Sequence, residues 1–175
     1  MGDDTIEEQL AWLARGPSMS VSTFQGYEIN GYTFYTRAQD QKSTNQNSGV
    51  RIDAIDNNGK KDKYYGVIEE IWELDYGPLK ISLFWCQWVK LTGGGVTTDN
   101  YGTTIVDLNK IGYIDEPFVL ANDVTQVFYV KDMASKPIRT GANRSDDQLK
   151  CNIVFLGKRK IVGVEDKTNI SDDYD

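Results

Sequence analysis

The sequence predicts a mainly β fold, a small and partly open β-barrel with a short helix at its N-terminus. Short runs rich in Thr, Tyr, Phe, Val and Ile recur along the chain, and turns containing Gly and Asn separate them. Only one segment, near the N-terminus, has a clear helical period. The chain of 175 residues shows no internal repeat and no linker that would divide it, so we expect one domain.

The expected parts of the chain are a helix with its linker, one β-rich domain and an acidic tail, at residues 1–17, 18–166 and 167–175. In the first part, Ile6, Leu10 and Leu13 have the spacing of one helical stripe, and the pattern stops at Gly16-Pro17. We expect this short amphipathic helix to pack on the barrel.

The first half of the domain contains three expected strands, at residues 18–27, 32–36 and 50–56. Asn30-Gly31 can adopt the left-handed conformations of a tight turn between the first two. Residues 37–49 are polar and are expected to form a long surface loop.

Residues 64–89 are the richest aromatic stretch and are expected to form a hairpin. The period of residues 64–76 fits a helix as well as a bulged strand, but the β-branched and aromatic content favours the strand. Tyr76-Gly77-Pro78-Leu79 supplies the turn. Residues 80–89 return with apolar side chains on both faces, as is typical of a central strand.

The second half of the domain alternates between expected loops and strands. Residues 91–101 contain three consecutive glycines and form a flexible loop, and residues 133–150 form a polar loop. The expected strands are residues 103–108, 125–130, 152–156 and 161–164, with a basic turn joining the last two.

Charge and composition argue against several functional classes. The net charge of −7 disfavours a broad grip on a nucleic-acid backbone. The chain has no histidine, which removes Ser-His-Asp and Cys-His catalytic groups and the commonest ligand of transition metals. We therefore expect no enzymatic activity, no cofactor and no metal site.

The cysteines and carboxylates add no further chemistry. Cys86 and Cys151 lie far apart without CxxC spacing, so neither a zinc site nor a disulfide framework is indicated and an intracellular location is expected. No apolar run approaches the roughly 20 residues that span a bilayer. The carboxylates that a two-metal site would need do not converge in the expected strands; they are Asp53, Asp56, Glu69, Glu70, Asp107 and Asp115.

Aromatic side chains of the hairpin offer a candidate ligand site. Several aromatic faces can hold a quaternary ammonium such as methylated lysine through cation–π attraction, and a nearby carboxylate favours the cation. The candidate cage consists of Tyr64, Trp72, Tyr76 and Trp88 with Glu70. It requires that no bulge separate Tyr64 from Trp72, and the alternative is that these rings form the barrel core.

Two basic turns offer a candidate nucleic-acid site. Their side chains could contact phosphates or act in nuclear import; they are Lys60, Lys61 and Lys63 in one turn and Lys158, Arg159 and Lys160 in the other.

Seven phrases of the sequence, taken in order, carry a family resemblance. They are LARGP (13–17), YEINGYTFYT (27–36), YYGVIEEIWELDYG (64–77), VDLNKIGY (106–113), DEPFVLA (115–121), QVFYVKD (126–132) and IVGVED (161–166). Together they resemble the plant domain-of-unknown-function family 4216, which is found alongside the transposase of CACTA (En/Spm) elements.

This resemblance implies a plant nuclear setting and a transposon origin, and it brings no catalytic residues. A looser similarity to bromo-adjacent homology modules implies a barrel of that type or an SH3-like barrel. The expected function is a non-catalytic accessory module of a CACTA-type transposase or transposon-derived protein, which binds a protein or chromatin partner. Two alternatives stay open: direct DNA binding by the basic turns, and self-association as a structural domain.

Overall fold

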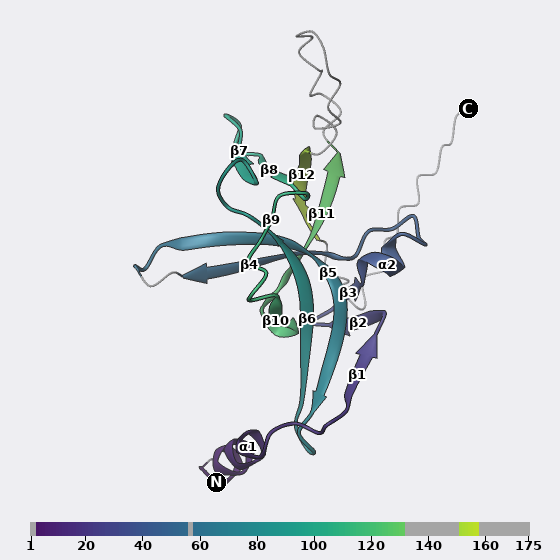
Figure 1. Cartoon of the computed structure of the whole chain (residues 1–175), viewed down its shortest axis with the longest axis vertical. Coiled ribbons are helices and arrows are strands. Elements are labelled where there is room, and N and C mark those ends of the chain that lie inside the picture. Colours follow the sequence, from purple (N-terminus) through teal and green to yellow (C-terminus); the bar gives the residue numbers. More distant parts are fainter. Residues whose placement is uncertain (1–2, 56–57, 132–150, 158–175) are drawn as a thin grey trace, which may run out of the picture.

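The structure is a computed structural model that describes residues 3–55, 58–131 and 151–157 (Figure 1). In chain order its elements are α1 (Asp3–Arg15), β1 (Val21–Phe24), β2 (Gly26–Ile29), β3 (Tyr32–Tyr35), α2 (Arg37–Asp40), β4 (Gly49–Ile55), β5 (Lys61–Asp75), β6 (Lys80–Val89), β7 (Val96–Thr98), β8 (Thr104–Asp107), β9 (Ile111–Gly112), β10 (Phe118–Leu120), a 3-10 turn (Ala121–Asp123), β11 (Thr125–Lys131) and β12 (Cys151–Leu156). The predicted mainly β class and the N-terminal helix are confirmed.

The long β5–β6 hairpin is the centre of a curled, half-barrel sheet (Figure 1). Beyond β6, β5 pairs with β4 along its first half and with β1 along its second half. The outer edge of β6 pairs with β9 and then with β10. Past β4 the sheet continues through β11, β12, β8 and β7, while β2 and β3 form a separate two-stranded sheet.

A β-bulge divides the hairpin into two parts. The register between β5 and β6 shifts between Ile68 and Glu70, so Glu69 is the extra residue. An extra residue in one strand reverses the alternation of side chains beyond it. Ile68 and Ile71 therefore point into the same core although they are three positions apart.

Two hydrophobic clusters fill the fold. The larger lies between the β5–β6 hairpin and the β2–β3 sheet, and its buried members are Phe34, Val50, Ile68, Ile71, Phe84, Cys86, Trp88 and Ala121. The smaller lies where β5 curls toward β8 and β11, and its buried members are Tyr65, Val67, Val106, Val127 and Tyr129. The curl of the sheet creates the second cluster, because it brings β5 toward β11 and β8, which lie beyond β4 in the strand order.

The turns that the sequence predicts around the hairpins are confirmed. Asn30 and Gly31 have φ values of 53° and 79°, the left-handed pair that a tight hairpin requires. In the β5–β6 turn, Gly77 has a φ of 88°, and Tyr76 N–H donates to the Leu79 carbonyl at 2.8 Å. The predicted strand at residues 80–89 coincides with β6.

Short elements depart from the prediction. The loop predicted at 37–49 begins with α2, and the loop at 91–101 contains β7. Both β9 and β10 were missed, since strands of two and three residues carry too little periodicity to be detected. The predicted strand 161–164, the loop 133–150 and the tail 167–175 lie outside the described residues, and β12 pairs with β11 and β8.

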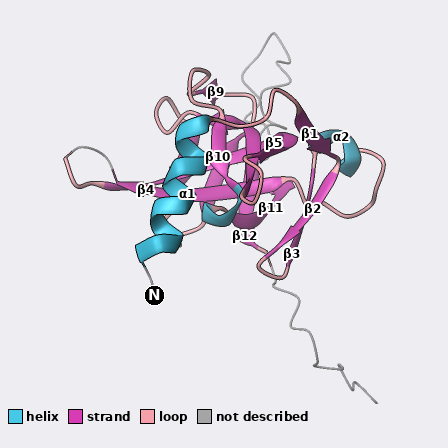
Figure 2. Ribbon diagram, turned by 90° about the horizontal axis from the view of Figure 1, so that it is seen from below, coloured by secondary structure: helices cyan, strands magenta, loops and turns pink. Residues whose placement is uncertain are grey.

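The N-terminal helix does not pack on the sheet through its apolar stripe, and this corrects the prediction. Ile6, Leu10 and Leu13 are 58%, 59% and 41% exposed. The helix lies at the end of the β5–β6 hairpin, outside the sheet (Figures 1 and 2). Its Trp12 is the side chain nearest the turn, with the ring 3.3 Å from the position that a Cβ on Gly77 would occupy.

Candidate functional site

The five residues of the predicted cage do not come together, because the bulge at Glu69 separates them. Tyr64 and Trp88 point toward the larger core, in which Trp88 is 4% exposed. Trp72 lies on the opposite face, with its ring 4.9 Å from that of Phe118. Residues on opposite faces of a sheet cannot enclose one ligand.

The cage residues instead have structural contacts. The indole Nε1 of Trp72 donates to Glu70 at 2.7 Å, and that of Trp88 donates to the Pro117 carbonyl at 3.2 Å. Tyr76 belongs to the β5–β6 turn.

The described basic turn lies among acidic neighbours. Lys60 forms an ion pair with Asp62 at 2.8 Å. Lys61 and Lys63 are exposed, and Lys63 lies opposite Asp53 in the β4–β5 register. The other predicted group, Lys158, Arg159 and Lys160, lies outside the described residues.

A different aromatic pocket lies beside β6, between the places where β9 and β10 pair with its outer edge. We call it the Trp85 pocket. It has a volume of about 360 Å³, and its walls are Glu69, Trp85, Cys86, Gln87, Trp88, Ile111, Gly112, Tyr113, Ile114 and Pro117. Trp85 and Tyr113 are 36% and 42% exposed, so both rings are accessible to a ligand. Residues 113–117 form its outer wall because they span from β9 to β10.

Tyr113 is held in an uncommon backbone conformation at this pocket. Its φ is 55°, in the left-handed region that bulky residues rarely adopt. Contacts on both sides hold the side chain: its ring lies edge-on to Tyr64 with centroids 5.2 Å apart, and its hydroxyl accepts the Leu91 N–H at 3.4 Å. Backbone strain of this kind concentrates at ligand sites and persists only where the surroundings enforce it.

The bulge places the carboxylate of Glu69 at the same pocket. Arg37 holds it, with Nη2 2.9 Å from Glu69 Oε1, and the same nitrogen donates to Gln87 Oε1 at 2.7 Å. This ion pair uses one of the two carboxylate oxygens. Bulges commonly re-aim a side chain at a functional site, and here the result is an acidic group beside aromatic walls.

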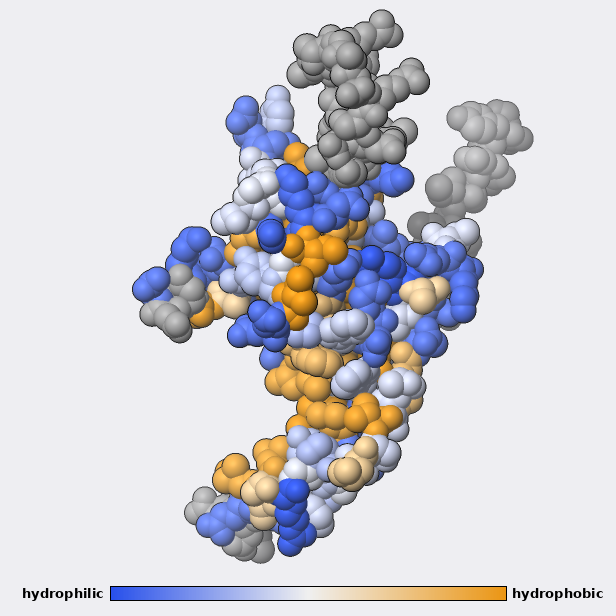
Figure 3. All heavy atoms as spheres, viewed as in Figure 1, coloured by the Kyte–Doolittle hydropathy of each residue, from blue (hydrophilic) through white to orange (hydrophobic). Residues whose placement is uncertain are grey.

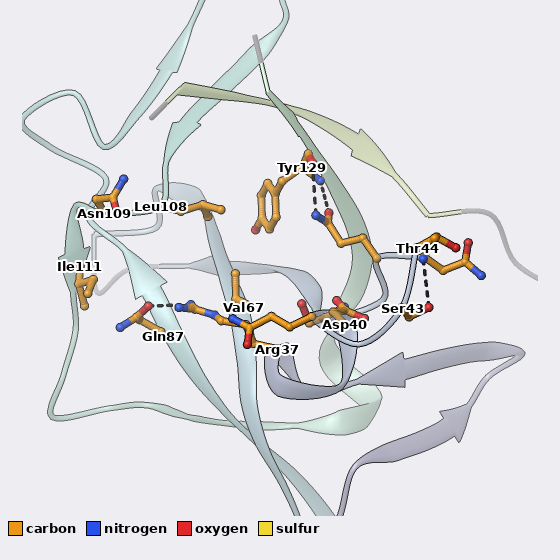
Figure 4. A pocket seen from close by; sticks show the side chains of 14 residues that line it. Arg37, Asp40, Ser43, Thr44, Val67, Gln87, Leu108, Asn109, Ile111 and Tyr129 are labelled. Atoms are coloured by element: carbon orange, nitrogen blue, oxygen red, sulfur yellow. Dashed lines mark hydrogen bonds between the residues drawn. The ribbon is translucent and has the colours of Figure 1, made fainter. Parts of the chain in front are cut away.

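Beyond Arg37 lies a larger polar cleft of about 660 Å³, between residues 37–48 and the strands β5, β6 and β11 (Figure 4). Its polar groups are engaged with one another. Gln46 Oε1 accepts the Tyr129 N–H at 2.6 Å and its Nε2 donates to the Tyr129 carbonyl at 3.4 Å, while Asp40 accepts the N–H groups of Asn47 and Ser48. These bonds account for the shape of the loop without a ligand, so the cleft is the weaker candidate site.

Two buried acids near these cavities remain protonated. Burial raises the pKa of the Cys86 thiol, and the Glu69 carboxylate raises it further. Burial also raises the pKa of Tyr129, whose hydroxyl donates to the Gly66 carbonyl at 2.8 Å. A protonated Cys86 is a poor nucleophile, and a phenolic Tyr129 can keep donating to Gly66.

Among the described residues, no group of three or more Cys, Asp or Glu side chains is placed to hold a metal ion. None of the described helices has the length and apolarity needed to cross a membrane.

Signals for the Trp85 pocket are weak in the sequence. Trp85 stands out as one of the hairpin tryptophans, and a bulge in residues 64–76 was predicted. The position of the bulge at Glu69 and the position of Tyr113 at the pocket depend on how β5, β9 and β10 pair with β6. No local sequence pattern indicates this pairing.

Comparison with known proteins gives one match. Residues 72–138 match the family model described as "Domain of unknown function (DUF4216)". This range contains β6, β9 and β10, and therefore every wall of the Trp85 pocket except Glu69. No match was found among curated proteins or among solved structures.

Proposed function

The chain carries the domain of unknown function 4216 over residues 72–138, and on that premise we propose that it is a non-catalytic binding module. Its partner is a basic protein segment, such as a chromatin protein presents, and its setting is nuclear, as an accessory module of a CACTA-type transposase or transposon-derived protein. The Trp85 pocket takes one cationic side chain of that partner, a lysine or methylated lysine.

The composition of the pocket wall supports this ligand. Trp85 and Tyr113 both line the pocket and are partly exposed, so a cation with an alkyl surface can reach aromatic surface there, and the carboxylate of Glu69, although paired with Arg37, belongs to the same wall. Lysine and arginine are absent from the lining, so no positive charge of the pocket wall itself opposes the ligand. Arg37 is paired with Glu69, and the stem of Lys90 lies beside Gly112 at the pocket wall.

The charge around the pocket favours the same partner. Asp115 and Glu116 are exposed on the segment that forms its outer wall, and the chain carries a net charge of −7. A basic segment is attracted by this field, whereas a nucleic-acid backbone is repelled. Direct DNA binding is the weaker candidate, because the described basic turn has acidic neighbours.

Peptide titration tests the proposal. A lysine-containing peptide is titrated into the protein in unmethylated and trimethylated forms, and binding is followed by calorimetry and tryptophan fluorescence. A third peptide carries the neutral carbon isostere of trimethyllysine, which has the same shape without the charge. We expect the cationic peptides to bind about 5- to 30-fold more tightly than the isostere, because one cation–π contact contributes about 1–2 kcal/mol.

Three variants assign the site. Trp85→Ala and Glu69→Gln are each expected to weaken binding about tenfold, while Tyr101→Ala removes a ring that is 94% exposed outside the pocket and leaves affinity unchanged. Each variant is first checked for an unchanged thermal midpoint. The proposal is contradicted if the isostere binds as tightly as the cationic peptides, or if Tyr101→Ala weakens binding as much as the two pocket variants do. Binding of a DNA duplex that weakens as salt is added supports the DNA alternative.

A further inference from the structure

The distal half of the β5–β6 hairpin has an apolar outer face, on the side opposite the larger core. The strand register places its side chains in adjacent rows across β10, β6, β5 and β1. The members of this outer face are Val21, Trp72, Leu74, Ile81, Leu83, Trp85, Phe118 and Leu120. Val21, Phe118 and Leu120 are 40%, 44% and 46% exposed, so no described element covers them fully.

The outer face resembles a core in composition. The polar residues in the same rows are Thr23 and Glu70, and Glu70 accepts the indole N–H of Trp72. On the side drawn in Figure 3, hydrophobic residues gather over the lower part of the hairpin and again on α1. Monomeric proteins rarely expose connected apolar surface of this kind, and where it occurs it commonly marks an interface.

The chain itself carries a matching element, the stripe of Ile6, Leu10 and Leu13 on α1. A helix that is apolar along one side is normally stabilised by burying that side. The stripe is 41–59% exposed, so within the described residues of one copy neither the stripe nor the outer face is fully covered.

The attachment of α1 prevents the stripe from covering its own sheet. Trp12 contacts the β5–β6 turn at Gly77, and Ser18 N–H donates to the Asp75 carbonyl at 2.7 Å directly after the helix. At about 100° per residue, Trp12 lies at least about 100° around the helix from each stripe residue. While Trp12 rests on the turn, the stripe points away from the described sheet.

From this geometry we infer that a second copy of the chain covers the outer face, and that the α1 stripe of each copy packs on the outer face of the other. Both surfaces lie at the same end of the molecule, so one twofold axis can pair them reciprocally. Each stripe then gains the apolar contacts that its own sheet cannot provide.

Salt distinguishes this interface from an electrostatic one. Two copies with a net charge of −7 repel each other, and added salt screens that repulsion. Apolar burial itself does not depend on attraction between charges. The dimer is therefore expected to strengthen with salt, whereas a complex with a basic peptide or with DNA weakens.

Analytical ultracentrifugation of the full chain, from about 1 to 200 μM and at low and high salt, measures the association. Leu10→Glu alters the stripe and Leu120→Glu alters the outer face. Ile55→Glu is the matched control, because Ile55 is 65% exposed on β4, away from both surfaces. Circular dichroism and the thermal midpoint confirm that the three variants fold.

We expect the chain to form a dimer that Leu10→Glu and Leu120→Glu each weaken at least tenfold. Ile55→Glu should leave the dimer unchanged. A chain that is monomeric throughout the range overturns the inference. A dimer that is insensitive to Leu10→Glu, or weakened equally by Ile55→Glu, also overturns it. None of these variants alters a residue that lines the Trp85 pocket, but Trp85 belongs to the outer face as well. Peptide binding is therefore measured at a concentration at which the chain is monomeric, so that loss of peptide binding and loss of the dimer are separate results.

Discussion

Gly66 lies directly under the indole of Trp88 in the β5–β6 register, and the Gly66→Ala substitution tests how the hairpin is packed. A Cβ at this position would lie 2.7 Å from Trp88 Cε3 and 2.8 Å from the Gln87 carbonyl oxygen. Trp88 is 4% exposed and donates to Pro117, so its ring has little room to move.

The expected destabilisation is about 2 kcal/mol. Overpacking a well-filled core costs about 1–3 kcal/mol, and displacing Trp88 from the Pro117 carbonyl costs about 1 kcal/mol more. Replacing glycine in the unfolded chain returns about 0.4–1 kcal/mol. For a chain of this length the thermal midpoint should fall by about 4–8 °C.

Urea unfolding followed by tryptophan fluorescence measures the change in the free energy of unfolding. In a Trp88→Phe background the same substitution should cost less, because the smaller ring leaves space, although the contact with the Gln87 carbonyl remains. A Gly66→Ala protein as stable as the parent chain, or an unchanged cost in the Trp88→Phe background, would refute the reasoning.

Three further predictions concern hydrogen bonds and burial. Glu70→Ala should reduce the free energy of unfolding by about 1 kcal/mol because Trp72 loses its acceptor, whereas Glu28→Ala on exposed surface should change it by less than about 0.5 kcal/mol; equal effects would contradict this. Gln46→Ala should cost about 1–3 kcal/mol and speed hydrogen exchange at the buried Tyr129 amide, and unchanged exchange would show that another group satisfies it. The Cys86 thiol should resist alkylation in the native protein at pH 8 and react after unfolding in urea, as peptide mapping can show. Because folding raises the pKa of the Cys86 thiol, the stability that the buried thiol contributes is fully present below the unfolded pKa of about 8.5 and is lost as pH rises above that value. A free energy of unfolding that increases above about pH 9 would contradict this.

The sequence located the central elements well because their signals are local. A run of β-branched and aromatic residues, interrupted by Gly77-Pro78, is sufficient to place the hairpin and its turn. The left-handed turn at Asn30-Gly31 follows in the same way from the backbone preferences of two residues.

The candidate site was less accessible to sequence reasoning. Tyr64 and Trp72 have the same parity in the chain, and one extra residue between them reverses that relation. Tyr113 comes from a different part of the chain, and a single sequence contains no signal that it lines the same pocket as Trp85.

The sequence by itself determined the β class, the central hairpin and the amphipathic character of α1, because each depends on residues close together in the chain. The tertiary structure decided the rest: the bulge at Glu69, the Trp85 pocket and the exposure of the α1 stripe. These features depend on which strand edges meet and on where Trp12 contacts the hairpin turn. Such contacts join residues that are far apart in the sequence, so no pattern within a single segment indicates them.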